Sequence, residues 1–373
     1  VSQSNDRLKF ISNFSGSAGF AIILKNKNYL FVDGRYTIQA RIQSAKNFKI
    51  FTIPQKFPKK VLKTKKELKI GFDPKLHNEN QLNFLFNIKN IVLKPISENL
   101  IDDIWSERPK DLIKPFFSLS NKDTGQNPQE KINKVKNILL KNKADYLFVT
   151  APENVAWILN IRGYDSEFSP IPNARLLINS KGNVDLFSQS KKFVKIKKNF
   201  SKKIKFQHEH KIEKKLRNLW KNNIWLDSLS CSVHYKSLLA KNNRIIQKID
   251  PIYFFKSIKN PTEIKNMKKS HMIDGVALTK FLFWLKKNFR KKKITEISAQ
   301  KKLENFRKMN RAYKFPSFNT ISGAGANSAI IHYRASAQSN RALKKGDLYL
   351  VDSGGQYSFG TTDVTRTISL DNN

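Results

Sequence analysis

Residues 348–370, LYLVDSGGQYSFGTTDVTRTISL, decide how the C-terminal part of the chain folds. Apolar residues lead up to Asp352, a glycine-containing segment follows, and alternation resumes over residues 364–367. This pattern predicts two strands joined by a turn, with one carboxylate on each strand, Asp352 and Asp363, eleven positions apart. Three glycines are expected to supply unusual backbone angles in the connection: Gly354, Gly355 and Gly360.

The two carboxylates pose an electrostatic problem. A carboxylate among buried strand residues is costly unless it is paired or binds a cation. Two such groups close together repel each other and raise one pKa, unless a divalent metal absorbs the charge. A salt bridge from Asp363 to Arg366 or to a distant Lys is the simpler alternative, and spacing alone leaves both interpretations open.

A histidine precedes this stretch. In residues 315–333, FPSFNTISGAGANSAIIHY, the turn Gly323–Asn327 is predicted to lead into a strand that carries His332. An isolated histidine of this kind is ordinarily a core residue hydrogen-bonded to a carbonyl. An imidazole also suits acid–base work, because its pKa lies near working pH.

Taken together, these two stretches resemble the Xaa-Pro aminopeptidases (aminopeptidase P) of the prolidase, creatinase and methionine aminopeptidase superfamily. The resemblance implies that Asp352 ligates one metal and that Asp363 bridges both ions of a dinuclear site, most often Mn²⁺. It implies that His332 is a catalytic residue that binds substrate and assists proton movement. The implied reaction removes the first residue from a peptide with proline second, using water activated by the two metals.

Length and composition bound the kind of protein. A chain of 373 residues is expected to form two or three domains, and 39% hydrophobic and 11% aromatic residues indicate a folded protein. No apolar run is long enough for a membrane span, and the start does not read as a secretory signal. The only cysteine, Cys231, excludes an internal disulfide and favours a reducing, cytoplasmic location. We interpret Cys231 as a structural residue.

The formal net charge of +41 raises the question of nucleic-acid binding. Lys far outnumbers Arg, and it accompanies many Ile and Asn residues, whose codons are rich in A and T. Compositional drift explains the charge as well as a polyanionic partner does. We expect no specific nucleic-acid partner and no membrane partner, only non-specific attraction at low salt.

The chain divides into three expected domains. Residues 1–125 and 126–256 each read as α/β, and residues 10–36 resemble the N-terminal domain of three-domain aminopeptidases P. Residues 257–373 resemble an incomplete pita-bread metallopeptidase domain, whose first helix starts at Asn260-Pro-Thr-Glu263. The predicted fold class is therefore α/β (α+β), with two creatinase-like domains before the catalytic one.

Further local patterns carry secondary predictions. Residues 10–24 are expected to form a glycine-punctuated turn that runs into a buried strand, and residues 99–109 a helix that stops at Pro109. The first helix of the third domain is expected to run to Lys293 with one apolar face, and a helix over 154–163 is expected to end at Gly163. Trp157 and Arg162 are interpreted as packing and helix C-terminal charge. His208 and His210 would share one face of a strand, but without a third ligand nearby we favour a solvated segment.

The resemblance also indicates what the chain lacks. The remaining family ligands, one His and two Glu, follow the Asp pair, so we expect a fragment of a longer enzyme, cut at both ends and inactive alone. The expected partners of the parent are a proline-containing peptide substrate and further copies of the same chain in a homo-oligomer, most simply a dimer. The alternatives are a non-catalytic binding module of the same fold and a prolidase- or creatinase-like hydrolase.

Overall fold

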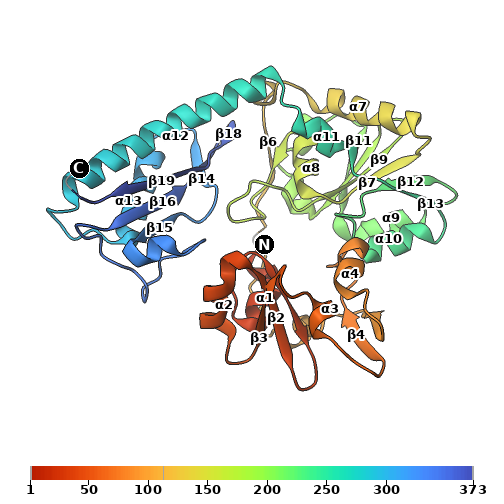
Figure 1. The fold of residues 1–373 in the computed structure, drawn as a ribbon. Helices are drawn as coiled ribbons and strands as arrows, with labels where there is room; N and C mark the ends of the chain where they lie inside the picture. The colour runs from red at the N-terminus through yellow and green to blue at the C-terminus, as the bar shows by residue number, and fades with distance from the viewer. Residues whose placement is uncertain (1, 112, 372–373) are drawn as a thin grey trace. The chain divides into compact units, whose positions relative to one another are not determined.

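The computed structural model describes residues 2–111 and 113–371 (Figure 1). The mixed α/β fold class is confirmed by the alternation of helices and strands along the chain. The chain forms two compact units. Unit 1 comprises Val1–Leu119, Gln126–Ser166 and Ile171–Ile258, and unit 2 comprises Ser120–Gly125, Glu167–Pro170 and Lys259–Asn373. The finer division into three domains stays a prediction.

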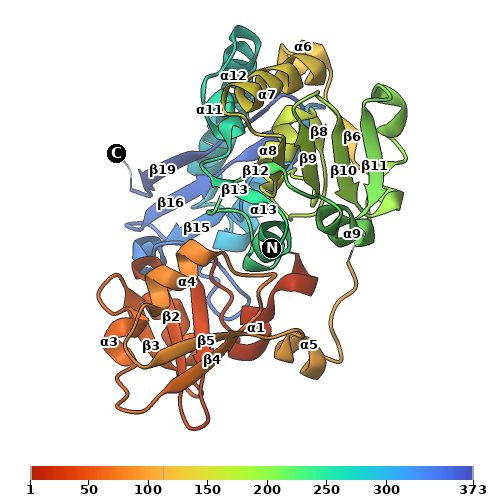
Figure 2. The same cartoon turned by 90° about the vertical axis from the view of Figure 1, so that its right-hand side faces the viewer.

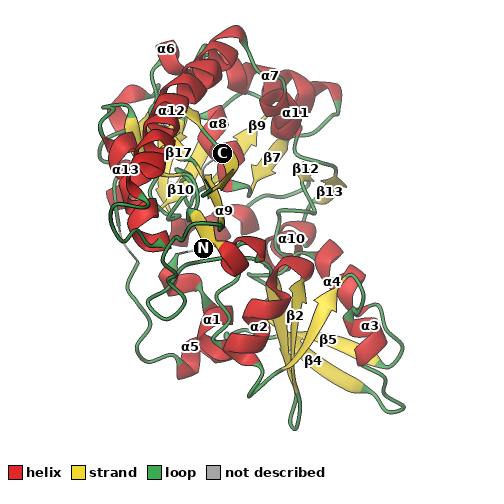
Figure 3. Cartoon of the chain, turned by 60° about the vertical axis from the view of Figure 1, so that its left-hand side comes forward, coloured by secondary structure: helices red, strands yellow, loops and turns green. Residues whose placement is uncertain are grey.

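Unit 1 begins with a small sheet in the order β1–β2–β3 (Figure 3). Strand β1 (Gly19–Ile23) runs antiparallel to β2 (Asn28–Asp33), and β3 (Lys49–Ile53) runs parallel to β2. A parallel pair, β4 (Leu68–Phe72) and β5 (Ile91–Pro95), packs against this sheet through a shared apolar cluster. The short helices of this region are α1 (Arg7–Ser12), α2 (Thr37–Ser44), α3 (Pro58–Val61), α4 (Glu79–Phe86) and α5 (Leu100–Ile104).

Two sequence predictions for this region need correction. The strand predicted to be buried before Leu24 is β1, in which only Ile22 is buried, whereas β2 forms the core of the sheet. The helix expected to stop at Pro109 already ends at Ile104, because the backbone leaves the helical region at Trp105.

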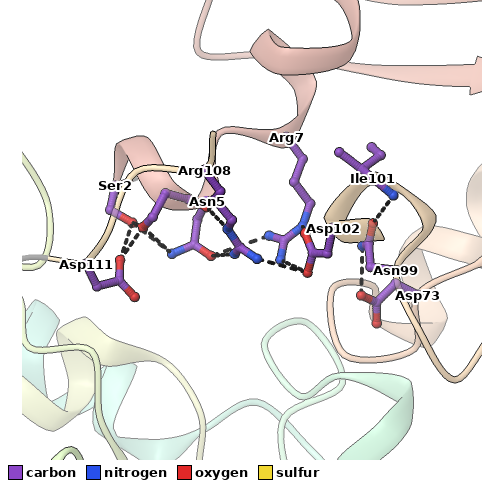
Figure 4. A network of polar contacts seen from close by, with 10 residues as sticks. Ser2, Asn5, Arg7, Asp73, Asn99, Ile101, Asp102, Arg108 and Asp111 are labelled. Carbon is purple, nitrogen blue, oxygen red and sulfur yellow. Dashed lines mark hydrogen bonds and ion pairs between the residues drawn. The ribbon is translucent and has the colours of Figure 1, made fainter. Parts of the chain in front are cut away.

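An ion-pair network joins the start of the chain to α5 (Figure 4). Arg7 donates from two nitrogens to the carboxylate of Asp102, each at 2.7 Å, and Arg108 reaches the same carboxylate at 3.1 Å. The hydrogen bond from Arg7 lowers the pKa of Asp102. Bidentate geometry of this kind fixes two segments that lie far apart in the sequence.

The larger sheet of unit 1 has six strands in the order β11–β10–β9–β7–β12–β13 (Figure 2). The pairing is parallel except where β9 meets β7 and β10. The strands are β7 (Tyr146–Val149), β9 (Arg175–Asn179), β10 (Val184–Ser188), β11 (Ile204–His208), β12 (Asn223–Leu226) and β13 (Arg244–Gln247).

Helices cover both faces of this sheet, because alternate strand residues point to opposite sides. Leu147 and Val149 of β7 pack with one apolar cluster, and Phe148 packs with the other. The first cluster includes residues of α7 (Pro128–Lys141), α8 (Pro152–Ile158) and α11 (Pro251–Ser257). The second includes residues of α9 (Ile212–Arg217) and α10 (Val233–Ala240). The 3₁₀ turns of unit 1 are η1 (Gln3–Asn5), η2 (Gly34–Tyr36), η3 (Ser190–Phe193), η4 (Lys197–Asn199) and η5 (Glu209–Lys211).

Helix α8 ends earlier than predicted. It stops at Ile158, Asn160 adopts a left-handed backbone with φ of 52°, and β8 (Ile161–Arg162) pairs with β6 (Phe117–Ser118). Trp157 is buried, and Arg162 donates to the carbonyl of Ala156 in the last turn of α8. These positions agree with the structural roles predicted for Trp157 and Arg162.

Unit 2 packs two helices on a three-stranded antiparallel sheet, β15–β16–β19 (Figure 1). Its helices are α6 (Asn121–Thr124), α12 (Pro261–Asn288) and α13 (Glu296–Lys308), and η6 (Gly325–Ala329) is a 3₁₀ turn. The strands of this sheet are β15 (Ile321–Ala324), β16 (Leu348–Ser353) and β19 (Val364–Ser369). A second antiparallel sheet has the order β14 (Tyr313–Pro316), β17 (Gly355–Tyr357) and β18 (Gly360–Thr361).

The start of α12 is as predicted, and its predicted apolar face is buried only in its second half. Asn260 and Glu263 form the reciprocal capping box. The helix ends at Asn288 rather than Lys293, and Ile264, Met267 and His271 of the expected apolar face are exposed. Leu278, Phe281 and Leu285 of that face are buried as predicted, together with Ser270, Asp274 and Ala277. Over residues 2–111 and 113–371, no helix has the length and apolarity needed to cross a membrane.

Candidate metal centre

The two predicted strands around Asp352 are β16 and β19. They pair antiparallel, with Asp352 opposite Thr365 and Ser353 opposite Val364. Asp363 lies immediately before β19, so only Asp352 is a strand residue. The connection is not a simple turn either, because it contains β17 and β18, which belong to the second sheet of unit 2. After β18 the chain returns to the end of β16, where Asp363 immediately precedes β19.

The glycines of this connection serve a different purpose from the one predicted. None of Gly354, Gly355 and Gly360 has a positive φ. A Cβ at Gly354 would overlap the carbonyl oxygen of Thr362 and the hydroxyl of Ser317. Close approach of neighbouring backbone, rather than an unusual dihedral angle, therefore requires glycine here.

The environment of Asp352 places three chemical groups near one another. Partial burial raises the pKa of Asp352, and the negative charge of Asp363 raises it further. The hydrogen bond from Thr365 Oγ1 to Asp352 Oδ1, at 2.8 Å, and the nearby His332 act in the opposite direction. Asp363 and His332 therefore lie near enough to Asp352 to shift its pKa, in opposite directions.

The simpler alternative for Asp363, a salt bridge, is not found. In the described part of the chain no Lys or Arg forms an ion pair with Asp363, which is exposed. Arg366 instead donates to the carbonyl oxygen of Thr365 at 2.7 Å. Asp363 therefore faces solvent beside another carboxylate.

His332 does not lie on a strand as predicted. It follows η6 in a tight turn closed by the bond from Tyr333 N to Ile330 O, at 3.1 Å, and its φ is 56°. The apolar residues before it suggested a strand, but Ile331 is 61% exposed. The imidazole is half-buried and the next residue, Tyr333, is buried.

These residues fit part of a divalent-metal site. Two acceptor-only carboxylates with uncompensated charge are the hard oxygen donors that Mg²⁺, Ca²⁺ and Mn²⁺ prefer. Within residues 2–111 and 113–371, no group of three or more His, Cys, Asp or Glu has the arrangement needed to hold a metal. The pair therefore supplies two donors of a set, and a complete cation cage needs further ligands.

The other titratable candidates do not join this centre. His208 ends β11 and His210 lies in η5, with their Nδ1 atoms 2.8 Å apart, so the pair is an exposed local hydrogen bond. Cys231 is a free thiol, 2% exposed, and burial raises its pKa to about 12. A thiol so rarely ionised is a poor nucleophile, in agreement with its structural interpretation.

The sequence interpretation missed one group of residues beside this centre. Asp274, Glu296 and Arg307 are charged side chains that are almost fully buried. Their helical context gave no signal, because polar residues on a helix ordinarily face solvent.

Comparison with protein families gives matches along the chain. The description "Creatinase/Prolidase N-terminal domain" matches residues 1–102 and again residues 107–263, and "Metallopeptidase family M24" matches residues 265–373. The part of the chain that holds Asp352 and Asp363 thus matches a metallopeptidase family, and the part before it matches creatinase-type N-terminal domains. Over nearly its whole length the chain is similar to the Xaa-Pro aminopeptidases.

Individual relatives support the similarity to the Xaa-Pro aminopeptidases. Xaa-Pro aminopeptidase 1 of Dictyostelium discoideum is 35% identical over 97% of the chain and 61% of the relative. Xaa-Pro aminopeptidase ApepP of Drosophila melanogaster is 33% identical, over 98% of the chain and 62% of the relative. The X-prolyl aminopeptidase of Caenorhabditis elegans, described as a cytosolic enzyme with a di-nuclear active site, superposes with a TM-score of 0.91 at 27% identity. The superposition includes the whole of this chain and 63% of the C. elegans chain. The chain thus spans about three fifths of the length of these relatives.

Proposed function

We propose that the complete protein is a metal-dependent aminopeptidase that removes the first residue from peptides with proline in second position. The observation that carries the proposal is the pair of half-buried Asp352 and exposed Asp363, near His332, with no ion pair from a Lys or Arg to either carboxylate among the described residues. Relatives named Xaa-Pro aminopeptidases, matched over nearly the whole chain, support the substrate class.

In this proposal the chain's own residues bind and orient. Asp352 and Asp363 would hold two divalent ions, for which we propose manganese, together with ligands from outside the described residues. When bound, such ions lower the pKa of water and polarise a scissile carbonyl. Thr365 holds one oxygen of Asp352 by a 2.8 Å hydrogen bond and so orients the carboxylate. His332 hydrogen-bonds the substrate and serves as a proton donor or acceptor for it.

The proposal includes a location in the cell. The C. elegans relative is described as cytosolic, and the reduced, buried thiol of Cys231 suits such a compartment, so we propose a cytoplasmic location. A homo-oligomeric assembly stays a prediction, as does the use of Mn²⁺ rather than another divalent ion.

The test uses the complete gene product, supplied with Mn²⁺. Release of the first residue is measured from a short Xaa-Pro-Xaa peptide and from an Xaa-Ala-Xaa control. Asp363→Asn is compared with Asp103→Asn, which removes one charge from an exposed site of α5. We expect proline-dependent release that is abolished by Asp363→Asn and unchanged by Asp103→Asn.

Two other outcomes point elsewhere. Bound metal without release from either peptide would exclude this substrate and favour a prolidase- or creatinase-like reaction. Neither metal nor release would favour the non-catalytic binding module.

A further inference from the structure

Glu296, the first residue of α13, is a carboxylate buried completely inside unit 2. Its oxygens accept hydrogen bonds from two backbone groups, Ala324 N at 2.8 Å and Arg341 N at 3.0 Å. They also accept from two side chains, Asn327 Nδ2 at 3.1 Å and Tyr333 OH at 2.8 Å. A buried carboxylate is tolerated because these donors replace its hydration.

Every group around this carboxylate is a donor, which restricts the residue at position 296. Oε1 faces Ala324 N and Asn327 Nδ2, while Oε2 faces Tyr333 OH and Arg341 N. A glutamine would have to turn its NH₂ group toward one of these pairs, so that the backbone N–H of either Ala324 or Arg341 would lose its acceptor. The site is thus matched to an ionised Glu. The helix N-terminus adds favourable electrostatics for a negative charge.

Three of the four donors come from the segment that carries His332. Asn327 lies in η6 before His332, Tyr333 follows it, and Arg341 lies beyond it. Asn327 Nδ2 also donates to Tyr333 OH at 2.8 Å, so Glu296 and Asn327 hold the same phenol. Burial raises the pKa of Tyr333 to about 12, which keeps the phenol protonated and able to donate. Residues 325–341 are therefore anchored by hydrogen bonds to one buried group, the carboxylate of Glu296.

His332 needs such an attachment. Its φ of 56° is a left-handed conformation that a non-glycine residue adopts only when its surroundings impose it. The adjacent peptide is held by the buried ring of Tyr333, whose hydroxyl contacts Glu296, Asn327 and Ser339. Releasing that hydroxyl removes the constraint nearest to His332, which allows the turn to relax.

We propose that Glu296 is a positioning residue for His332: through Tyr333 and Asn327 it fixes the turn that aims the imidazole at the Asp352–Asp363 pair. The inference rests on the proposed function for its kinetic consequence, but its structural content concerns only the conformation of His332. Glu296 itself does not touch the substrate.

The first test measures the histidine rather than activity. The 373-residue chain, with its six histidines labelled with ¹³C at Cε1, gives one NMR signal per histidine, and His332→Ala assigns the signal of His332. We expect Glu296→Gln and Tyr333→Phe to shift or broaden the His332 signal and to leave the exposed His271 signal in place. The matched control is Glu304→Gln, which removes a charge from the same helix at a pair with Lys308. An unchanged His332 signal in both variants would overturn the proposal.

The second test uses a double-mutant cycle in the complete gene product. We expect Glu296→Gln to lower kcat/KM roughly 10- to 100-fold for the Xaa-Pro peptide, because misplacement of a catalytic group has effects of this size. In a His332→Ala background, Glu296→Gln should lower kcat/KM by less than about twofold, because the group that Glu296 positions is absent. Losses that multiply in the double variant would show a merely structural role for Glu296 and overturn the proposal.

The two tests separate the inference from the proposed function. If His332→Ala retains full activity, the catalytic role given to His332 is wrong, while the NMR signal still decides whether Glu296 positions it. If Glu296→Gln does not fold, Tyr333→Phe, which removes a single hydroxyl, takes its place in both tests.

Discussion

Arg307 and Asp274 form a fully buried, two-point ion pair between α13 and α12. Arg307 Nε lies 2.7 Å from Asp274 Oδ1 and Nη2 lies 3.0 Å from Oδ2. Arg307 also donates to Ser353 Oγ at 3.0 Å, and Tyr357 OH donates to Asp274 Oδ1 at 2.7 Å. Because Ser353 directly follows Asp352, this network ties both helices to the strand that carries the first proposed metal ligand.

Breaking this pair from one side is expected to destabilise unit 2 strongly. Arg307→Met keeps most of the side-chain volume but leaves Asp274 charged, buried and short of two donors, at a cost of about 3 to 5 kcal/mol. Urea denaturation of the 373-residue chain measures the change. Lys308→Met provides the control, because Lys308 pairs with Glu304 at the surface, where such pairs contribute about 0.5 kcal/mol.

The double variant Arg307→Met/Asp274→Leu adds a check on the cause. It removes both charges, so it should be more stable than Arg307→Met alone, although Tyr357 loses its acceptor. A double variant less stable than either single variant would contradict the explanation by an unpaired buried charge.

Local patterns account for what could be predicted from the sequence. The cap at Asn260 and the strands around Asp352 follow from neighbouring residues, and both were confirmed. The donors to Glu296 lie 28 to 45 positions away from it, and Arg307 finds Asp274 and Ser353 at 33 and 46 positions. Such partners depend on tertiary packing. The strand prediction at His332 was wrong for the same reason, because distant contacts overrode the strand preference of its apolar neighbours.

Removing one carboxylate of the proposed metal pair is expected to leave the metal-free chain no less stable. Asp363 makes no ion pair within the described residues, and it opposes the ionisation of Asp352. In the presence of a chelator, Asp363→Asn should therefore keep or slightly raise the free energy of unfolding, by under about 1 kcal/mol at low salt. The gain should shrink at high salt, because screening weakens the repulsion between partly exposed charges.

The measurement is urea denaturation at two salt concentrations, with Asp103→Asn as the charge-matched control. A marked loss of stability in Asp363→Asn would mean that the carboxylate has a structural partner, and would count against its assignment as a metal ligand.

The thiol of Cys231 is expected to report unfolding rather than reactivity. Its side chain is 2% exposed and burial raises its pKa to about 12, so little thiolate exists at neutral pH. A disulfide reagent should label the folded chain very slowly, and the rate should rise with urea as unfolding exposes residues of the α9–α10 cluster. Fast labelling without denaturant, at the rate of a free thiol, would show that this cluster opens readily.

Asp250 is expected to make unit 1 less stable as the pH rises through the weakly acidic range. It is 2% exposed, caps α11 through the bond from Ile252 N at 2.9 Å, and accepts from Asn154 Nδ2 at 2.8 Å. Burial raises its pKa from 3.8 to about 6. The folded state therefore holds a proton between these two pH values that the unfolded state has released. Stability from this group is present below pH 4 and is lost as the pH approaches and passes 6.

The difference amounts to roughly 2 to 3 kcal/mol by the usual conversion of a pKa shift into free energy. The variant Asp250→Asn keeps an oxygen to cap α11 but cannot ionise. Comparing urea denaturation of the variant and the parent chain from pH 4 to pH 7 cancels the contributions of all other titrating groups. We expect the stability of the variant relative to the parent to rise across this range and then to level off above pH 6. A constant difference would mean that Asp250 keeps the same charge throughout, and that the buried carboxylate is compensated by its neighbours.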